Sequence, residues 1–222
     1  MGFDFGGRRV VVAGGSRGIG RAIALGFAAA GAGVSICARG AEALGKAREE
    51  IAAHGVPAHA ATCDLAEVAR YVAEAEQALG GIDVLVNNAS GFGMSDDEAG
   101  WAAGLSVDVM AMVRASRAAL PALERSSGAS IIHVSSISGL RPSTRTPAYA
   151  AVKATMIHYT QSQAAALARK GIRVNCIAPG SIEFAGGLWE KRRLAGDPLY
   201  DRILASIPFG RLGMPEEVAD VA

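Results

Sequence analysis

Short apolar runs alternate with longer amphipathic or Ala-rich segments along most of the chain. The apolar runs are rich in Val and Ile, which is typical of strands buried on both faces of a parallel sheet. They lie at 9–13, 33–37, 57–61, 82–86, 129–134 and 171–177. The segments with helical character between them lie at 18–30, 41–54, 66–79, 97–125 and 148–169. This alternation predicts an α/β fold in three layers, with a single doubly wound parallel sheet between two layers of helices.

The alternation loosens after residue 180. The stretch 181–213 is rich in Gly, Arg and Pro, and we interpret it as an inserted lid over one end of the sheet. A last helix is expected to begin near Pro215, and the chain ends at Ala222. No linker, repeat or low-complexity tract divides the chain, so we expect 1–222 to form one domain.

Composition and charge exclude several classes of protein. The chain has 222 residues, of which 50% are hydrophobic and 19% charged, and its formal net charge is +1. This balance argues against binding nucleic acid by bulk electrostatics. No apolar run is long enough to span a bilayer, and the N-terminus has no signal-peptide pattern. We therefore expect a cytoplasmic protein whose partners are neither nucleic acid nor membrane.

The cysteines and histidines predict neither disulfides nor a metal site. Cys37, Cys63 and Cys176 are widely spaced and odd in number, so we interpret them as reduced, half-buried or buried thiols. The four histidines show no spacing typical of metal ligands.

A glycine-rich turn joins the strand at 9–13 to the helix that follows it. Gly14, Gly18 and Gly20 form the pattern G-x-x-x-G-x-G. In a Rossmann-type sheet such a turn lets a pyrophosphate approach the backbone, and the helix N-terminus offers free N–H groups and partial positive charge. The spacing differs from the common G-x-G-x-x-G, so a plain tight turn is the alternative interpretation.

Two arginines favour NADP over NAD as the dinucleotide. An NAD site usually has an acidic residue at the end of the second strand, where it binds the ribose 2′-hydroxyl. Here that position is occupied by Arg39, and Arg17 lies within the glycine turn. Two guanidinium groups suit a 2′-phosphate. The alternative for Arg39 is a solvated surface arginine.

Tyr149 and Lys153 have the spacing of two residues on one face of a helix, so their side chains point the same way. A nearby ammonium group stabilises a phenolate and prepares the tyrosine for acid–base chemistry. Ser136 lies at the end of the strand at 129–134, at the edge where open α/β sheets bind ligands. These three residues are the candidate catalytic group.

Several motifs together resemble the short-chain dehydrogenase/reductase family, most closely its 3-oxoacyl-carrier-protein reductase-like branch. The motifs occur in the family's order: AGGSRGIG at 13–20, Asp64, NNAS at 87–90, Ser136 thirteen residues before Tyr149, APG at 178–180 and FGRLGMPEEVAD at 209–220. The resemblance covers nearly the whole chain.

The resemblance implies a role for each matching residue. Tyr149 would be the general acid in reduction and the base in oxidation, Lys153 would bind the nicotinamide ribose, and Ser136 would hydrogen-bond the substrate carbonyl. Asp108 occupies the position of the family's fourth catalytic residue. The residues expected to bind the cofactor are Gly14, Ser16, Arg17, Gly18, Ile19, Gly20, Arg39, Asp64, Leu65, Asn87, Ala89, Ser90, Tyr149, Lys153, Pro179, Gly180 and Ile182.

The chain departs from the family pattern at several positions. Ala13 and Ser90 replace a threonine and a glycine, and we expect both changes to be tolerated. Asp108 replaces an asparagine that helps hold a water linked to the lysine, and we expect the proton relay to survive. Phe184 replaces a threonine that touches the carboxamide, so the nicotinamide would be held by backbone or the loop would be placed differently. The family's last strand would follow the helix near Pro215; either the sequence is truncated before that strand, or the protein lacks it.

The function expected from these motifs is NADP(H)-dependent hydride transfer between nicotinamide and a carbonyl or secondary alcohol. Arg141, Arg145 and the basic run 191–193 are either solvated surface or a lip for an acidic substrate such as a 3-oxoacyl thioester. The alternatives are a dehydrogenase of a small alcohol or sugar, a lyase or epimerase with bound cofactor, a dinucleotide-binding protein without turnover, and a methyltransferase on a similar sheet. The family resemblance also implies a homotetramer or dimer, formed through the helices at 97–125 and 148–169.

Overall fold

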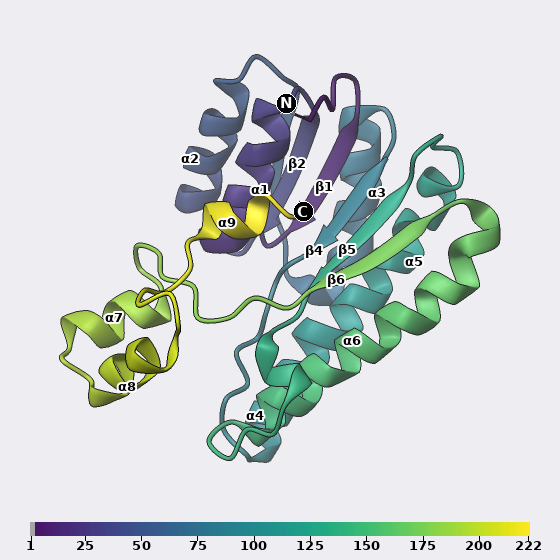
Figure 1. The fold of residues 1–222 in the computed structure, drawn as a ribbon. Helices are drawn as coiled ribbons and strands as arrows, with labels where there is room; N and C mark the ends of the chain where they lie inside the picture. The colour runs from purple at the N-terminus through teal and green to yellow at the C-terminus, as the bar shows by residue number, and fades with distance from the viewer. Residues whose placement is uncertain (1–2) are drawn as a thin grey trace.

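The computed structural model describes residues 3–222 and contains one sheet of six parallel strands (Figure 1). The strand order is β3-β2-β1-β4-β5-β6, so the chain reverses its direction of winding between β1 and β4. The strands are β1 Arg9–Ala13, β2 Gly33–Ala38, β3 Ala58–Thr62, β4 Val84–Asn87, β5 Ser130–Val134 and β6 Arg173–Ile177. The predicted doubly wound fold is confirmed, and ligands of such sheets bind beyond the carboxyl ends of the strands at the switch point.

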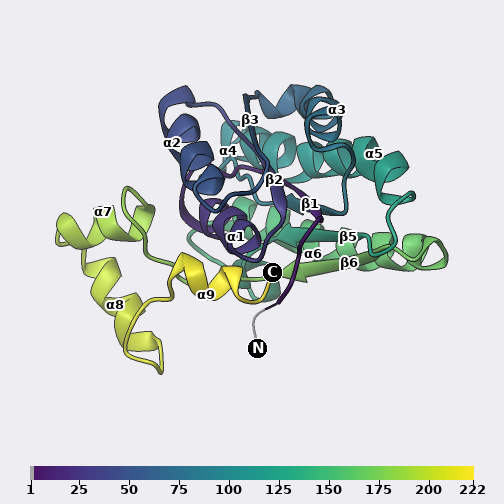
Figure 2. The same ribbon diagram turned by 90° about the horizontal axis from the view of Figure 1, so that it is seen from above.

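Helices cover both faces of the sheet, as Figure 2 shows from above. One layer contains α1, α2 and α9, and the other contains α3, α5 and α6. The helix bounds are α1 Gly18–Ala29, α2 Ala41–Ala52, α3 Val68–Leu79, α4 Glu98–Gly104, α5 Ala111–Leu123, α6 Pro147–Leu167, α7 Leu188–Leu194, α8 Pro198–Ser206 and α9 Pro215–Ala219. In residues 3–222 we find no helix with the length and apolar character needed to cross a membrane.

Strand β1 explains how a run of apolar residues serves both layers. Val10 and Val12 belong to the core under α1 and α2, whereas Val11 and Ala13 belong to the core under α3 and α5. Side chains alternate between the two faces of a strand, so a strand covered on both sides needs apolar residues at consecutive positions.

The segment predicted as one helix at 97–125 is not uniform. It begins as α4, continues as a π-helical stretch over Leu105–Met110, and ends as α5. Wider helical turns of this kind are rare and occur frequently at functional sites. Asp108 lies in this stretch and is buried.

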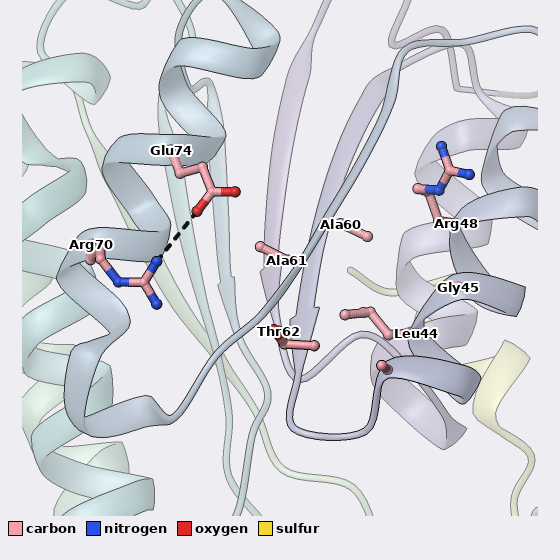
Figure 3. Close-up of a pocket in the computed structure, with 9 residues that line it drawn as sticks. Leu44, Gly45, Arg48, Ala60, Ala61, Thr62, Arg70 and Glu74 are labelled. Carbon is pink, nitrogen blue, oxygen red and sulfur yellow. Dashed lines mark ion pairs between the residues drawn. The ribbon is translucent and has the colours of Figure 1, made fainter.

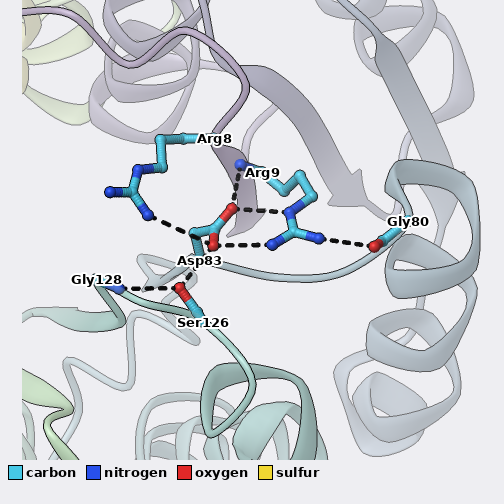
Figure 4. Close-up of polar contacts among 6 residues, drawn as sticks. All are labelled: Arg8, Arg9, Gly80, Asp83, Ser126 and Gly128. Carbon is cyan, nitrogen blue, oxygen red and sulfur yellow. Dashed lines mark hydrogen bonds and ion pairs between the residues drawn. The ribbon is translucent and has the colours of Figure 1, made fainter.

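The amino ends of β1 and β4 are joined by a polar network that surrounds Asp83 (Figure 4). The carboxylate accepts hydrogen bonds from the Arg9 backbone N–H at 2.9 Å, Arg9 Nε at 2.8 Å and Ser126 Oγ at 2.6 Å. Arg8 Nη1 lies 3.8 Å from the same carboxylate. This network holds together the amino ends of the strands. It lies at the end of the sheet opposite the carboxyl ends, where the candidate site is located.

The expected lid at 181–213 contains the short helices α7 and α8, which project from the body of the molecule in both ribbon views (Figures 1 and 2). A parallel bridge between Ile182 and Gly213 closes this segment at its base. The last helix, α9, then returns to pack on α1.

Candidate active site

The glycine turn is compact because its glycines leave no room for side chains. A Cβ on Gly20 would lie 2.0 Å from the Gly14 carbonyl oxygen, and a Cβ on Gly14 would lie 2.9 Å from the Ala89 backbone. Gly14 and Gly18 have φ of +88° and +52°, a region that favours glycine. Asn88 Nδ2 donates to the Gly14 carbonyl at 2.8 Å, which ties the turn to the end of β4.

The N-terminus of α1 follows directly from this turn and is suited to an anion. Its N-cap residue, Arg17, is extended and makes no side-chain cap, and the first turn contains no acidic residue. The first N–H groups of the helix therefore keep their hydrogen-bonding capacity and partial positive charge. A pyrophosphate group fits this arrangement of close backbone and helix N-terminus.

The two cations expected at the adenosine end are exposed, and neither forms an ion pair with residues 3–222. Arg39 follows the end of β2, and Arg17 precedes α1. Asp64 lies at the end of the neighbouring strand, where its carboxylate accepts from the Ala66 N–H at 3.0 Å and caps the 3₁₀ helix Leu65–Glu67. The structure thus places Arg17, Arg39 and Asp64 along one edge of the sheet.

Ser136 and Tyr149 lie at the carboxyl end of β5 and the start of α6. Ser136 Oγ accepts from the Ser138 N–H at 3.1 Å and caps the 3₁₀ helix Ile137–Leu140. Ser135 Oγ donates to the Lys153 carbonyl at 2.8 Å, which holds the first turns of α6 against the strand end. Tyr149 is half-buried, so part of this residue remains exposed at the start of α6.

Lys153 is buried and is paired with Asp108. Its Nζ lies 2.8 Å from Asp108 Oδ1, and the side chains are 2% and 1% exposed. The contact has the distance of an ion pair without the angles of a directional hydrogen bond. Lys153 Nζ also donates to the Val134 carbonyl at 3.2 Å and lies 5.6 Å from the centre of the Tyr149 ring. The ammonium group is therefore held directly beside the tyrosine.

The other Asp108 oxygen binds the loop after β4. The Gly91 N–H donates to Asp108 Oδ2 at 2.8 Å. One carboxylate therefore connects the candidate catalytic lysine with the loop that begins at NNAS.

Asn87 points its side chain into the core, away from the strand-end surface. Its Nδ2 donates to Ser116 Oγ at 3.3 Å and to His133 Nδ1 at 3.1 Å. The partners of His133 assign it as a neutral ring that accepts from Asn87 and donates from Nε2 to Gln163 Oε1 at 2.9 Å. Burial lowers the pKa of His133 to about 4, only partly opposed by the Gln163 bond. Sequence reasoning missed this network, and the only sign of it was a polar residue inside an apolar strand.

Pro179, Gly180 and Ile182 follow β6 along the same edge of the sheet. The Pro179 carbonyl accepts from the Ile137 N–H at 3.0 Å, which joins this segment to the one after Ser136. The Phe184 ring packs on the glycine turn, since a Cβ on Gly18 would lie 2.6 Å from its Cζ. Phe184 therefore covers one side of the turn that a phosphate would approach.

Two arginines of the basic run are occupied within the lid. Arg193 Nε donates to Glu183 Oε1 at 2.6 Å, and Tyr200 OH donates to the other oxygen of that carboxylate at 2.8 Å. Arg192 pairs with Asp197. Arg141 and Arg145 are exposed and form no ion pair with residues 3–222, so this pair keeps its charge available.

A groove of about 470 Å³ lies elsewhere, between α2 and α3 over the outer edge of β3 (Figure 3). Arg48 and Arg70 flank it, and Arg70 faces Glu74 at 3.7 Å. The groove contains none of the expected site residues, so we do not assign the reaction to it. Residues 3–222 contain no cluster of three or more side chains suited to binding a metal ion.

Comparisons with known proteins find similarity along most of the chain. The model of a family described as short chain dehydrogenase matches residues 8–193. Isoepoxydon dehydrogenase patN from Aspergillus clavatus is 37% identical over 97% of this chain and 86% of its own length. The 3-oxoacyl-[acyl-carrier-protein] reductase FabG from Chlamydia trachomatis is 34% identical over 97% of this chain and 88% of its own.

Solved structures share the fold at similar identity. A short chain dehydrogenase from Burkholderia cenocepacia in complex with NADP has a TM-score of 0.89 at 35% identity, over 97% of this chain and 89% of that one. An NAD+-bound xylitol dehydrogenase has a TM-score of 0.90 at 26% identity, over 98% and 91% of the two chains.

Proposed function

The chain belongs to the short-chain dehydrogenase family, and we propose that it transfers hydride between NADP(H) and a carbonyl compound or the corresponding secondary alcohol. One observation supports this proposal above the others. Tyr149, with Lys153 beside it, and Ser136 lie at the same strand-end edge as the glycine turn. A protein that only binds a dinucleotide has no need for these three side chains.

In this proposal Tyr149, Ser136 and Lys153 have different roles in the reaction. NADP(H), when bound, supplies or accepts the hydride. In reduction, the Tyr149 hydroxyl donates a proton to the substrate oxygen, and in oxidation its phenolate takes that proton back. Ser136 Oγ donates a hydrogen bond to the same oxygen and stabilises the charge that develops on it. The Lys153 ammonium, held in place by Asp108, lies beside the Tyr149 ring.

NADP is the cofactor that the charges at the adenosine end favour. Arg17 and Arg39 are exposed cations near the end of β2, where the 2′-phosphate of NADP would lie. The NADP complex of the Burkholderia relative supports the same choice, whereas the xylitol dehydrogenase relative binds NAD+. In our proposal the phosphates bind at the α1 N-terminus. The other cofactor-binding residues predicted from the sequence, which lie at the ends of the strands, line the rest of the cofactor site.

The substrate class is a ketone or secondary alcohol, and a 3-oxoacyl thioester is one member of it. The FabG relative from Chlamydia trachomatis and the unpaired Arg141 and Arg145 support an acidic carrier on the substrate. Arg192 and Arg193 give that candidate less support, because each already pairs with a lid carboxylate. We also propose that copies associate through the segment 97–125 and through α6; Trp101, Leu105 and Met110 are exposed on the first of these.

Ligand-dependent thermal unfolding tests the cofactor assignment. A ligand at a hundredfold excess over its Kd stabilises the folded state by about 2.7 kcal/mol. We expect a larger rise in Tm with NADPH than with NADH, and nearly equal rises in an Arg17→Ala, Arg39→Ala variant. Equal rises in the unchanged protein would exclude the two arginines as phosphate-binding residues, and no rise with either nucleotide would contradict the proposed cofactor site.

Turnover tests the catalytic assignment. NADPH oxidation in the presence of a ketone should fall by roughly 10²-fold or more in Tyr149→Phe. The Tm shift with NADPH should persist in that variant, because the glycine turn, Arg17, Arg39 and Lys153 are unchanged. Full activity in Tyr149→Phe would exclude this tyrosine as the proton donor.

A further inference from the structure

We propose that the outer edge of β3 binds an extended acidic segment of a partner protein, which adds to the sheet as a further strand. The site is the groove of about 470 Å³ between α2 and α3, and it contains none of the residues assigned to the reaction (Figure 3). In this mode of recognition main-chain hydrogen bonds give affinity, and the side chains around the groove give specificity. The proposal does not depend on the proposed function.

The first observation is that one side of β3 has backbone groups that face away from the sheet. β3 is at the end of the strand order and pairs with β2. Directly after β3, the Cys63 N–H donates to the Ala38 carbonyl of β2 at 3.0 Å. Backbone groups of successive residues in a strand point to opposite sides, so those of Ala58, Ala60 and Thr62 point away from β2. Within residues 3–222 these outward N–H and C=O groups have no hydrogen-bond partner.

The second observation is that this edge lacks the features that normally prevent strand addition. Edge strands of native proteins often carry charged residues, a proline or a bulge, which discourage pairing with another chain. β3 has the sequence AHAAT, and all five of its residues stay in register with β2. Ala60 and Thr62 line the groove together with Gly45 of α2, so small side chains leave room beside the outward backbone groups. The edge is therefore open to another strand.

The third observation is the charge of the groove, which selects the partner. The charged residues that line it are Arg48, Arg70 and Glu74, two cations and one carboxylate. Arg48 on α2 is exposed and forms no ion pair with residues 3–222. Arg70 on α3 lies 3.7 Å from Glu74, as Figure 3 shows, so Arg48 is the uncompensated charge among the lining residues. An acidic residue of the added strand complements this charge.

The alternation of side chains along a strand predicts where that acidic residue lies. Ala60 packs against the core on the α2 side of the sheet, and Ala61 packs against the core on the α3 side. An added strand alternates in the same way, so every second side chain lies on the α2 side with Arg48. A second copy of β3 is a poorer occupant, because it would bring two grooves of the same net positive charge together.

Fluorescence anisotropy with labelled peptides tests the choice of partner. The probe is TTVEVTT with blocked termini, whose residues favour strands and whose carboxylate is central, and TTVQVTT is its neutral counterpart. We expect saturable binding of TTVEVTT, and about two- to fivefold weaker binding of TTVQVTT, the scale of one exposed charge pair. Arg48→Gln should remove this difference between the two peptides.

Arg169→Gln is the matched control for Arg48→Gln. Arg169 is also exposed and forms no ion pair with residues 3–222, but it lies after α6, outside the groove. We expect this variant to bind both peptides as the unchanged protein does. Equal binding of the two peptides by the unchanged protein, or binding of neither, would overturn the proposal.

Changes to the backbone test strand addition itself. Ala60→Pro removes an outward N–H and leaves the hydrogen bonds to β2 in place, and proline is tolerated at such edge positions. We expect this variant to lose binding of TTVEVTT, with urea unfolding as the check that it is folded. A concentration-dependent dimer that Ala60→Pro abolishes, without peptide binding by the unchanged protein, would overturn the proposal and assign the edge to a second copy.

N-methylation of the peptide makes the test independent of that variant. Methyl groups on the alternate amides that face β3 should abolish binding, whereas methyl groups on the other alternate set should leave it unchanged. This period of two is expected for an added strand and not for a charged peptide held by its side chain alone. Equal effects of the two sets would overturn strand addition.

Discussion

Lys153 Nζ lies 2.8 Å from Asp108 Oδ1, and both side chains are almost fully buried. Removing two charges from water is costly, and their mutual attraction offsets that cost only while both partners are present. The Asp108 carboxylate also accepts the Gly91 N–H. Aspartate at this position therefore balances the positive charge of Lys153 and accepts a hydrogen bond from the loop after β4. A neutral asparagine could accept that hydrogen bond but would not balance the charge.

Replacing Asp108 should separate these roles. Asp108→Ala leaves the Lys153 ammonium buried without a partner, and we expect the free energy of unfolding to fall by about 3–5 kcal/mol. Asp108→Asn keeps the shape and one acceptor, so we expect a smaller loss and turnover within about tenfold of the unchanged protein, equivalent to about 1.4 kcal/mol. Urea unfolding and pH–rate profiles measure the two effects. A far more active Asp108→Asn would show that the aspartate is a defect in the relay.

Removing the Phe184 ring should ease access to the glycine turn. The ring covers Gly18, and Phe184→Thr exposes that side of the turn. We expect the association rate of NADPH, measured by stopped-flow fluorescence, to rise several-fold, up to roughly tenfold for about 1.4 kcal/mol. Leu188→Ala is the control, since Leu188 is an exposed apolar residue on α7. Faster NADPH dissociation with no gain in association rate would show that the ring contacts the bound nucleotide.

The His133 network should make the fold sensitive to mild acid. The native pKa of His133 is about 4 because the ring is buried, whereas an unfolded histidine has a pKa of about 6.5. Between pH 6.5 and pH 4, His133 is protonated in the unfolded chain but stays neutral in the native state. Stability should therefore fall by about 3 kcal/mol as the pH decreases from 6.5 to 4.

Urea unfolding between pH 7 and 4.5 measures this loss. His133→Asn keeps a donor and an acceptor but cannot titrate, so its stability should depend less on pH in this range. An equal dependence in both proteins would exclude His133 as the source.

Asp83 should affect the stability of the fold in a more acidic range of pH than His133. Burial alone would raise the pKa of Asp83, but the hydrogen bonds from Arg9 and Ser126 lower it to about 2. The resulting stability, about 2 kcal/mol, is present above pH 4 and is lost as the pH falls toward 2. We expect Asp83→Asn to lose a similar amount at pH 7, measured by urea unfolding. Asp201→Asn, on the exposed surface of α8, should change stability by less than about 0.5 kcal/mol.

The sequence by itself determined the features that depend on neighbours along the chain. The strand predicted at 9–13 was found with those bounds, because three consecutive valines suit only a strand buried on both faces. The relative placement of Tyr149 and Lys153 followed from the pitch of a helix. The doubly wound parallel sheet followed from the alternation of strands and helices with right-handed crossovers, whereas the order of its strands came from the structure.

Tertiary structure alone decided which polar groups meet. The segment 97–125 was predicted as one helix, yet the π-helical stretch within it turns Asp108 toward Lys153 and Gly91. The basic run at 191–193 was a candidate lip, yet two of its arginines pair with lid carboxylates. These contacts join residues that are distant in sequence or lie on different turns of a loop. No local periodicity encodes them, because they depend on how the helices and loops pack after the sheet has formed.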